Sequence, residues 1–358
     1  GYINLPIENT LNWHIYEMVF GVGSAMIVAF FLTGLPELFP GVVPIVGRHL
    51  AFIALWWVLG RVSFWFMDYL SIHFTAIINI SLTAYIGYLA AIPAFRDRNK
   101  KHVSLAYSMV SIVVVQTLFF LSELKLVNLD SFKVLLLSIS LILVLILLAL
   151  RRVSMESINE LLEQENIDET FLAKSFRYNL AIFTVLLYGF VEFFFPENSS
   201  LAYICFAVGS AILGVLNDFK LKDNFILNKP FVLYIVSTIV LTSVGFFFLG
   251  FNYLFELHFT NHFRHFITTG TYGLVFYVIL IIVSTIHTGR EIFTSWALTL
   301  GLILIIIATF MRAFIPYFLE YSMILYILSS TIWACSFVIY IKTFFPFLLS
   351  KRADGIKG

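Results

Sequence analysis

Apolar residues are gathered along this chain into long runs that are separated by short polar segments. Eleven of the runs are long enough to cross a bilayer as α-helices, which takes about 20 residues each. They cover residues 13–35, 48–67, 72–95, 103–122, 132–150, 178–195, 201–217, 230–251, 264–286, 293–311 and 321–345. The pattern predicts an all-α, polytopic integral membrane helix bundle with about 11 transmembrane helices.

Basic residues are distributed unevenly between the alternate connecting segments. With eleven spans, 17 of the 22 Lys and Arg residues fall on the side of the C-terminus, four fall on the opposite side and Arg61 lies within a span. An excess of Lys and Arg is typical of cytoplasmic loops. We therefore predict a cytoplasmic C-terminus and place Gly1 on the outer side.

The longest connection, residues 151–177, is acidic in its middle and carries Ile158, Leu161 and Leu162 at helical spacing. This pattern predicts a short amphipathic helix on the cytoplasmic side. We expect residues 1–358 to form a single transmembrane domain, whose two halves are joined by this cytoplasmic loop.

The composition supports a membrane protein and excludes several other classes. Hydrophobic residues make up 60% of the chain and charged residues 12%, about half the charge of a soluble domain. The net charge of +1 argues against a nucleic-acid partner. Cys205 and Cys335 form no CxxC motif, and no Walker or dinucleotide fingerprint occurs.

The most informative stretch runs from Arg264 to Arg290. It reads as one apolar helix with His265 near its start and His287 near its end. Twenty-two residues at about 1.5 Å each place the two imidazoles roughly 33 Å apart, about the thickness of a hydrocarbon core. At about 100° per residue they are only about 40° apart around the axis, so both would lie on one stripe.

Small residues follow His265, and among them Gly270 and Gly273 leave room for a flat cofactor or for a neighbouring helix. We interpret the helix as one that offers an imidazole to a bound group near each membrane face. The alternative is a pair of interfacial histidines that only reach water.

Three histidines lie around the start of this helix. His258, His262 and His265 stand at i, i+4 and i+7, and a continuous helix would bring them to one face at a spacing that suits a transition metal. Thr260 has the character of an N-cap, which would leave His258 in the preceding loop. A wet loop with surface histidines is the alternative.

The first span begins with His14 and Glu17 at i and i+3, with Tyr16 between them and Trp13 beside them. A carboxylate next to a histidine can hold the imidazole in the tautomer that a metal needs. An interfacial belt of aromatic residues is the plain alternative.

Arg61 lies about three turns into the second span, and Asp68 follows seven residues later on the same predicted face. One interpretation is an ion pair between these two side chains. The other is an anchor for a haem propionate, because a charged group inside a membrane usually pairs or binds something.

Taken together, these stretches resemble the NnrS family, bacterial inner-membrane proteins that are associated with nitric oxide response and reported to carry haem and copper. The matching stretches are Trp13-His14-x-x-Glu17-Met18-x-Phe20-Gly21, Phe30-Phe31-Leu32-Thr33-Gly34-x-Pro36, Leu55-Trp56 with Gly60-Arg61, Arg96-x-Arg98-Asn99, and His265-x-x-Thr268-x-Gly270-x-x-Gly273 ending in His287-Thr288-Gly289-Arg290. The last stretch is the most specific, and the likeness covers most of the chain.

The resemblance implies a protein of nitric oxide and nitrosative-stress metabolism in the bacterial inner membrane, with haem b and copper as cofactors. The implied cofactor-binding residues are His14, His265, His287, Arg61, Gly270 and Gly273. The implied metal ligands are His14, His262, His265 and His287. Tyr16 and Glu17 would donate protons or hydrogen bonds, NO would be the gas ligand, and a redox partner or quinol would donate electrons.

The chain departs from the family pattern at three places. Tyr16 stands where the family usually has a second histidine, and the stretch Thr117–Ser122 lacks a histidine that many members carry. A further helix usually precedes the Trp-His motif, so the family-like total is twelve spans, with the first one missing here. His262 or His73 are the candidates to replace the absent ligand.

Two other functions remain open. A transporter or channel for a small solute would use Arg61, Glu17 and Glu192 to line a pathway, and the similar starts of the first and ninth spans would fit a duplicated fold. A non-catalytic accessory subunit would instead bind a partner oxidoreductase. Pigment and metal content separate the haem protein from both.

Overall fold

The computed structural model describes residues 10–100, 102–221, 229–291, 293 and 295–355, which divide into two compact units. Unit 1 is Gly1–Leu145 and unit 2 is Ile146–Gly358. Over the described residues the chain is helical and contains no β-strand, so the predicted all-α membrane bundle is confirmed. The predicted location of Gly1 falls outside the described residues.

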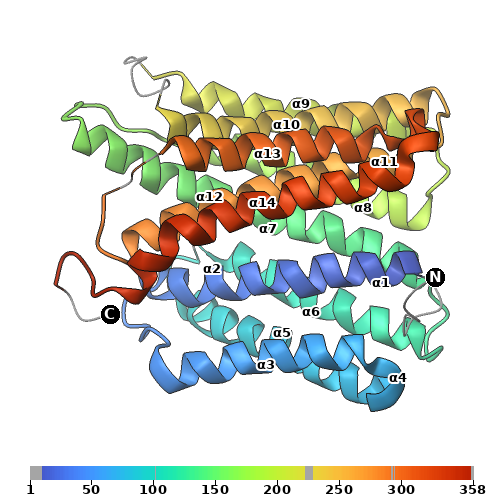
Figure 1. Ribbon diagram of the computed structural model, residues 1–358, viewed down its shortest axis with the longest axis horizontal. Coiled ribbons are helices and arrows are strands. Elements are labelled where there is room, and N and C mark those ends of the chain that lie inside the picture. Colours follow the sequence, from blue (N-terminus) through green and yellow to red (C-terminus); the bar gives the residue numbers. More distant parts are fainter. Residues whose placement is uncertain (1–9, 101, 222–228, 292, 294, 356–358) are drawn as a thin grey trace. The chain divides into compact units, whose positions relative to one another are not determined.

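Unit 1 begins with a span in which three helical segments follow one another without a break. The elements of unit 1 are α1 (Thr10–Tyr16), the π-helix η1 (Glu17–Val22), α2 (Gly23–Leu38), α3 (Gly47–Trp65), α4 (Met67–Leu70), α5 (Ile72–Arg96), α6 (Val103–Glu123) and the first part of α7 (Ser131–Gln164). Within this unit α5 packs against α3 and α6 (Figure 1).

Unit 2 contains the rest of α7 and a second span that is interrupted by a π-helix. Its elements are α8 (Ser175–Phe194), α9 (Ser200–Leu213), η2 (Gly214–Phe219), α10 (Pro230–Leu254), α11 (Thr260–Phe263), the π-helix η4 (Phe266–Thr271), α12 (Tyr272–Ile286), α13 (Trp296–Ala313), η5 (Ile315–Tyr317), η6 (Leu319–Tyr321) and α14 (Ser322–Leu349). Helix α9 packs against α8 and α10, α10 against η4, and α13 against α14.

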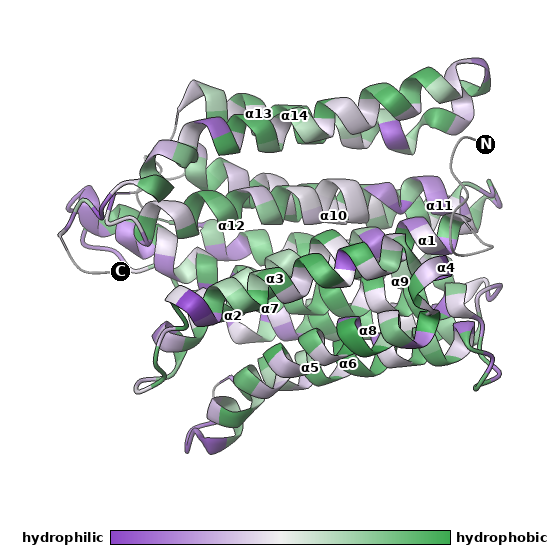
Figure 2. Ribbon diagram, turned by 60° about the horizontal axis from the view of Figure 1, so that its bottom comes forward, coloured by the Kyte–Doolittle hydropathy of each residue, from purple (hydrophilic) through white to green (hydrophobic). Residues whose placement is uncertain are grey.

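Ten helices in the described part of the chain are long and apolar enough to cross a membrane. The predicted span 48–67 is the one that does not reach this standard. It forms α3, a helix of 19 residues, but Arg48, His49 and Arg61 lower its hydropathy. Figure 2 shows that the helices are mainly hydrophobic and that the connecting segments are more hydrophilic.

Helix α3 nevertheless presents an apolar surface. Leu55, Val58 and Val62 are exposed, at 56%, 45% and 45%. Their spacing of three and four residues puts these side chains along one face of the helix. Such a face is suited to contact with lipid, because the exposure of these apolar side chains to water is unfavourable.

The predicted cytoplasmic loop 151–177 is partly helical. Helix α7 continues without a break as far as Gln164, so the expected amphipathic helix is the end of a long span rather than a separate element. Ile158 and Leu162 are 0% and 1% exposed, which accounts for their helical spacing in the sequence.

The span that starts near His265 is not the continuous α-helix that the sequence predicted. The π-helix η4 separates α11 from α12. A π-turn holds about one more residue than an α-turn, which shifts the register by roughly 100°. The predicted offset of about 40° between His265 and His287 was calculated for an uninterrupted α-helix, so it does not apply across η4.

Each π-helix places a backbone carbonyl against the indole of a tryptophan from another helix. In unit 1, Trp57 Nε1 donates to the carbonyl of Gly21 at 3.1 Å. In unit 2, Trp333 Nε1 donates to the carbonyl of Thr269 at 3.2 Å. Because π-turns displace carbonyls from the usual helical bonds, these indoles satisfy groups that lipid could not.

Gly270 and Gly273 lie where neighbouring helices approach the span. An added Cβ at Gly270 would stand 2.7 Å from Leu241 Cδ2 and 2.9 Å from Thr309 Cγ2. At Gly273 it would stand 2.7 Å from Trp333 Nε1. Of the two occupants predicted beside these glycines, the structure places neighbouring helices there.

Gly273→Ala is therefore expected to destabilise the protein by about 1–3 kcal/mol, because the new methyl group displaces the Trp333 indole from the Thr269 carbonyl. Thermal unfolding in detergent measures this as a lower midpoint. Gly34→Ala is the matched control, since no atom lies within 4 Å of the added Cβ. Equal midpoints for the two variants would contradict the packing described here.

Candidate functional site

The predicted site residues fall in both units. His14, Tyr16, Glu17 and Arg61 belong to unit 1. His262, His265, Gly270, Gly273 and His287 belong to unit 2. His14 lies half-buried in α1.

Arg61 and Glu17 form an ion pair inside unit 1. Arg61 Nη1 lies 2.5 Å from Glu17 Oε2, and the two side chains are only 12% and 16% exposed. Trp65 Nε1 donates to Glu17 Oε1 at 3.0 Å, and Arg61 Nη2 donates to Asn79 Oδ1. Glycine at position 21 provides the space, because a Cβ there would stand 2.8 Å from Arg61 Nη1.

The ion pair between Arg61 and Asp68, one of two interpretations of these residues, does not form. Helix α3 ends at Trp65, and Asp68 lies exposed in the separate short helix α4. The helical spacing that would have aligned the two side chains is therefore broken. Because Glu17 neutralises Arg61, the pair as a whole carries no net positive charge that would attract an anionic cofactor group.

Tyr16 is fully buried among aromatic rings. Its ring stacks on Phe64 and Phe119 at centroid distances of 4.3 and 4.7 Å, and its hydroxyl accepts a hydrogen bond from Gln116 Nε2 at 3.0 Å. Glu17 accepts from two donors and points to a different set of partners. These contacts describe two satisfied side chains and lend no support to a proton-donating role for either.

Unit 2 contains a second buried ion pair, which the sequence analysis did not find. Arg264 binds Glu192 through two bonds, Nη2 to Oε1 at 2.8 Å and Nη1 to Oε2 at 3.1 Å. Tyr188 and Tyr253 donate to the same carboxylate at 2.5 and 3.1 Å. Glu192 and Arg264 are 4% and 6% exposed, so the pair is almost fully removed from solvent.

Two matched ion pairs argue against a solute pathway lined by Arg61, Glu17 and Glu192. Each charge is neutralised by a partner within its own unit. Buried pairs of this kind fix the packing of helices, because separating them leaves a charge in a low dielectric. The only sequence signal for the second pair was one carboxylate and one arginine inside predicted spans.

His265 is held in a defined tautomer next to Arg312. Arg312 Nε donates to His265 Nε2 at 3.2 Å, so Nε2 carries the lone pair. The proton then lies on Nδ1, which is 3.2 Å from the carbonyl of His262 and donates to it. A backbone carbonyl that orients an imidazole in this way is the usual second partner of a metal-bound histidine.

His262 lies close to His265 without sharing its bonds. The two ring centroids are 6.5 Å apart. His262 lies against the backbone of Arg312, and its Nδ1 is buried without a hydrogen bond of ordinary geometry. This end of unit 2 therefore holds two imidazoles and one guanidinium, which we call the His265 cluster (His262, His265 and Arg312).

The predicted face of three histidines does not form. His258 lies in the loop before α11, exposed and with a φ of 60°. Thr260 is the first residue of α11 rather than its N-cap, and its hydroxyl accepts from Asn252 Nδ2 at 2.8 Å. Across the described residues, no three His, Cys, Asp or Glu side chains gather as a metal site.

His287 is exposed at the other end of α12, where the chain leaves the helix. Gly289 N donates to the carbonyl of Ile286 at 2.9 Å and Arg290 N donates to that of Thr285 at 3.1 Å, the two bonds of a Schellman motif. Gly289 has the positive φ, 68°, that this motif requires. The final part of the most specific sequence stretch is thus a helix terminator.

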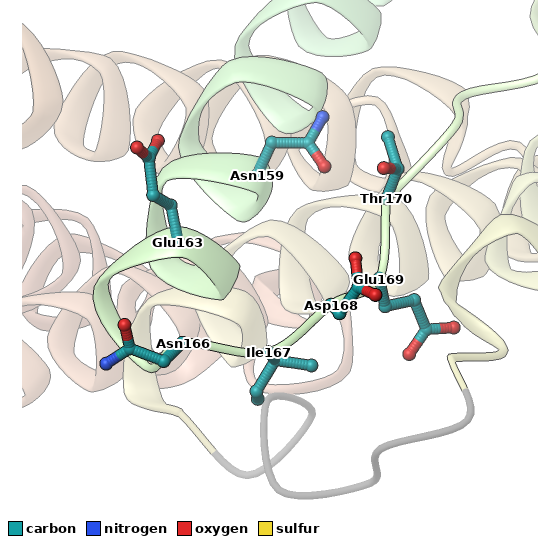
Figure 3. Close-up of a pocket in the computed structure, with 7 residues that line it drawn as sticks. All are labelled: Asn159, Glu163, Asn166, Ile167, Asp168, Glu169 and Thr170. Carbon is teal, nitrogen blue, oxygen red and sulfur yellow. The ribbon is translucent and has the colours of Figure 1, made fainter.

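A pocket of about 570 Å³ lies elsewhere, at the end of α7 (Figure 3). Glu163, Asp168 and Glu169 line it, and the side chain of Asn159 binds the backbone of Phe171 at 2.7 and 3.1 Å. None of the predicted site residues borders this pocket.

A comparison with known families shows which family the chain is similar to. A family model described as NnrS protein matches residues 2–352, nearly the whole chain. The chain belongs to the NnrS family. Neither a curated protein nor a solved structure matches it.

The residues of this NnrS protein fit haem better than a bare metal ion. The tautomer of His265 leaves Nε2 as the nitrogen that would hold a haem iron, and Arg312 beside it would pair with a carboxylate. A copper centre would need three or more ligands in one place, and the described residues offer only His262 and His265 together. The predicted copper site therefore has no support in this geometry.

Glu192→Gln in this NnrS protein is expected to lower stability by about 3–5 kcal/mol, because Arg264 keeps its charge and loses its counter-ion. The midpoint of thermal unfolding in detergent gives the effect. Glu156→Gln is the control, since its pair with Arg152 is exposed by 44% and 39% and contributes about 1 kcal/mol or less. If Glu192→Gln lowers the unfolding midpoint no more than Glu156→Gln does, the Glu192–Arg264 pair is hydrated in solution.

Proposed function

We propose that this NnrS protein binds haem b at His265 and handles nitric oxide there, in the bacterial inner membrane. The observation that carries the proposal is the tautomer of His265. Its Nδ1 donates to a backbone carbonyl, and the lone pair of its Nε2, which accepts from Arg312 Nε, is the one that would hold the iron of a haem. Family membership connects the chain to nitric oxide response.

Haem held at His265 would supply an iron that binds NO, and a redox partner or quinol would supply the electrons for reduction of the bound NO. The protein supplies orientation and surroundings. The His262 carbonyl orients the imidazole through its bond to Nδ1. Phe266 and Ile267, which follow His265 in the chain, are buried, with 0% and 2% exposed. Arg312 holds a positive charge next to the ligand nitrogen.

The proposed orientation places the His265 end on the periplasmic side and the C-terminus on the cytoplasmic side. The asymmetry of Lys and Arg across the spans supports this arrangement. NO crosses lipid freely as a small apolar gas, so a site near either face is accessible to it. His287, at the opposite end of the span, is the candidate for a second site.

His265→Ala is expected to reduce bound haem by more than about tenfold, because loss of a ligand costs at least as much as loss of an outer partner. The protein is purified in detergent from cells supplied with haem, and its visible spectrum and NO difference spectrum are recorded. His49→Ala is the control, since His49 is exposed and its side chain bonds the Tyr85 hydroxyl at 2.8 Å.

Full haem content in His265→Ala would rule out this ligand. The same measurement on His287→Ala, His14→Ala and His262→Ala tests the other predicted ligands separately. A wild-type protein that is colourless after growth with haem would contradict the proposed function as a whole.

A further inference from the structure

Three arginines lie inside or at the ends of the spans on the side that we predict to be periplasmic, and two of them have a carboxylate partner. Arg61 pairs with Glu17 and Arg264 pairs with Glu192. Arg312, in the last turn of α13, has no carboxylate within ion-pair distance among the described residues. A half-buried cation without a counter-ion is costly in an apolar bundle, so it usually binds an anion.

The contacts of Arg312 leave the two terminal nitrogens of its guanidinium available to a ligand. Its Nε donates to His265, and its guanidinium carbon lies 4.3 Å from the centre of the Tyr326 ring. The two terminal nitrogens have no hydrogen-bond acceptor in the described part of the chain and are not sealed from contact. They form the planar pair of donors that matches a carboxylate.

The positive charge of Arg312 determines which kind of ligand can bind the lone pair of His265 Nε2. A bare metal ion at Nε2 would displace Arg312 and then stand beside an uncompensated positive charge in a low dielectric. A ligand that carries its own carboxylate would attract the displaced guanidinium instead. The same arginine therefore disfavours one class of ligand and favours the other.

We propose that Arg312 selects a carboxylate-bearing metalloporphyrin at His265 and excludes a bare metal cation. This rests on the proposed haem function. In the absence of haem, Arg312 occupies the lone pair of His265. On binding, Arg312 releases the lone pair to the ligand and pairs with a porphyrin carboxylate.

The direct test compares two porphyrins on the whole chain in detergent. Iron protoporphyrin IX carries two carboxylates, and its dimethyl ester carries none. Wild-type protein is expected to bind the acid at least about tenfold more tightly than the ester, as charge-assisted bidentate pairs do. Arg312→Gln is expected to bring that ratio close to one, and Arg312→Lys to restore part of it.

The matched control is Arg290→Gln. Arg290 also lies over an aromatic ring, Phe347, at 4.3 Å, but it bonds the Thr288 carbonyl and Ser350 instead of an imidazole. Its loss is expected to leave the acid-to-ester ratio unchanged. An Arg312→Gln ratio equal to the wild-type ratio overturns the proposal.

A second experiment measures the affinity for Cu²⁺ alone, and its result does not depend on whether the protein binds haem. Arg312→Gln is expected to bind Cu²⁺ at least about tenfold more tightly than wild type, because the repelling charge is gone. Equal affinities overturn the exclusion. If wild type binds no haem but this difference is present, the proposed function fails while the exclusion by Arg312 stands.

Nitrite alone separates the two possible sources of the anion. A porphyrin carboxylate as the natural partner predicts no saturable nitrite binding to the haem-free protein below millimolar concentrations. Tight nitrite binding that disappears in Arg312→Gln would make the site one for a free anion and would overturn the assignment to a porphyrin.

Discussion

A charge buried between apolar helices must find its partner within the bundle, and this constraint organises both units. In unit 1 the carboxylate comes from the first span and the guanidinium from α3, at 2.5 Å. In unit 2 the carboxylate of Glu192 on α8 receives Arg264 and two tyrosine hydroxyls. Neither pair can separate without leaving a charge in a low dielectric, so each fixes the approach of the helices that carry it.

Against this pattern, the His265 cluster is exceptional. Its guanidinium is balanced by no carboxylate in the described chain, and one of its nitrogens binds an imidazole lone pair. The two other arginines at the ends or inside of the spans on this side, Arg61 and Arg264, are paired with carboxylates, so the imbalance at Arg312 marks the place where an external anion would complete the structure. That is the physical basis for locating a ligand at this end of unit 2 and not at Arg61.

Hydropathy was sufficient to predict the spans, because lipid requires long apolar helices whatever their neighbours are. It placed α3 among them correctly as a helix, although its charges keep it below the hydropathy of the others. Helical spacing was less reliable. It paired Arg61 with Asp68 across a helix end, and it gathered His258 with His262 and His265 across a loop.

The ion pairs could not be predicted, because each joins residues that are far apart in sequence and depends on which helices pack together. Glu192 and Arg264 are 72 positions apart. The π-helices were also missed, because hydropathy and helical spacing do not distinguish a π-turn from an α-turn. What the sequence did indicate was the close approach of a neighbouring group at Gly270 and Gly273.

The π-helix η4 also sets the direction in which the residues before it point. Arg264 and His265 immediately precede it, and the rest of the span follows as α12. Removing one residue from this turn would rewind it as an α-helix and rotate everything upstream by roughly a quarter of a revolution. The Arg264 guanidinium would then move away from Glu192, and the His265 imidazole would move away from Arg312. The one extra residue in η4 therefore sets the orientation of both side chains.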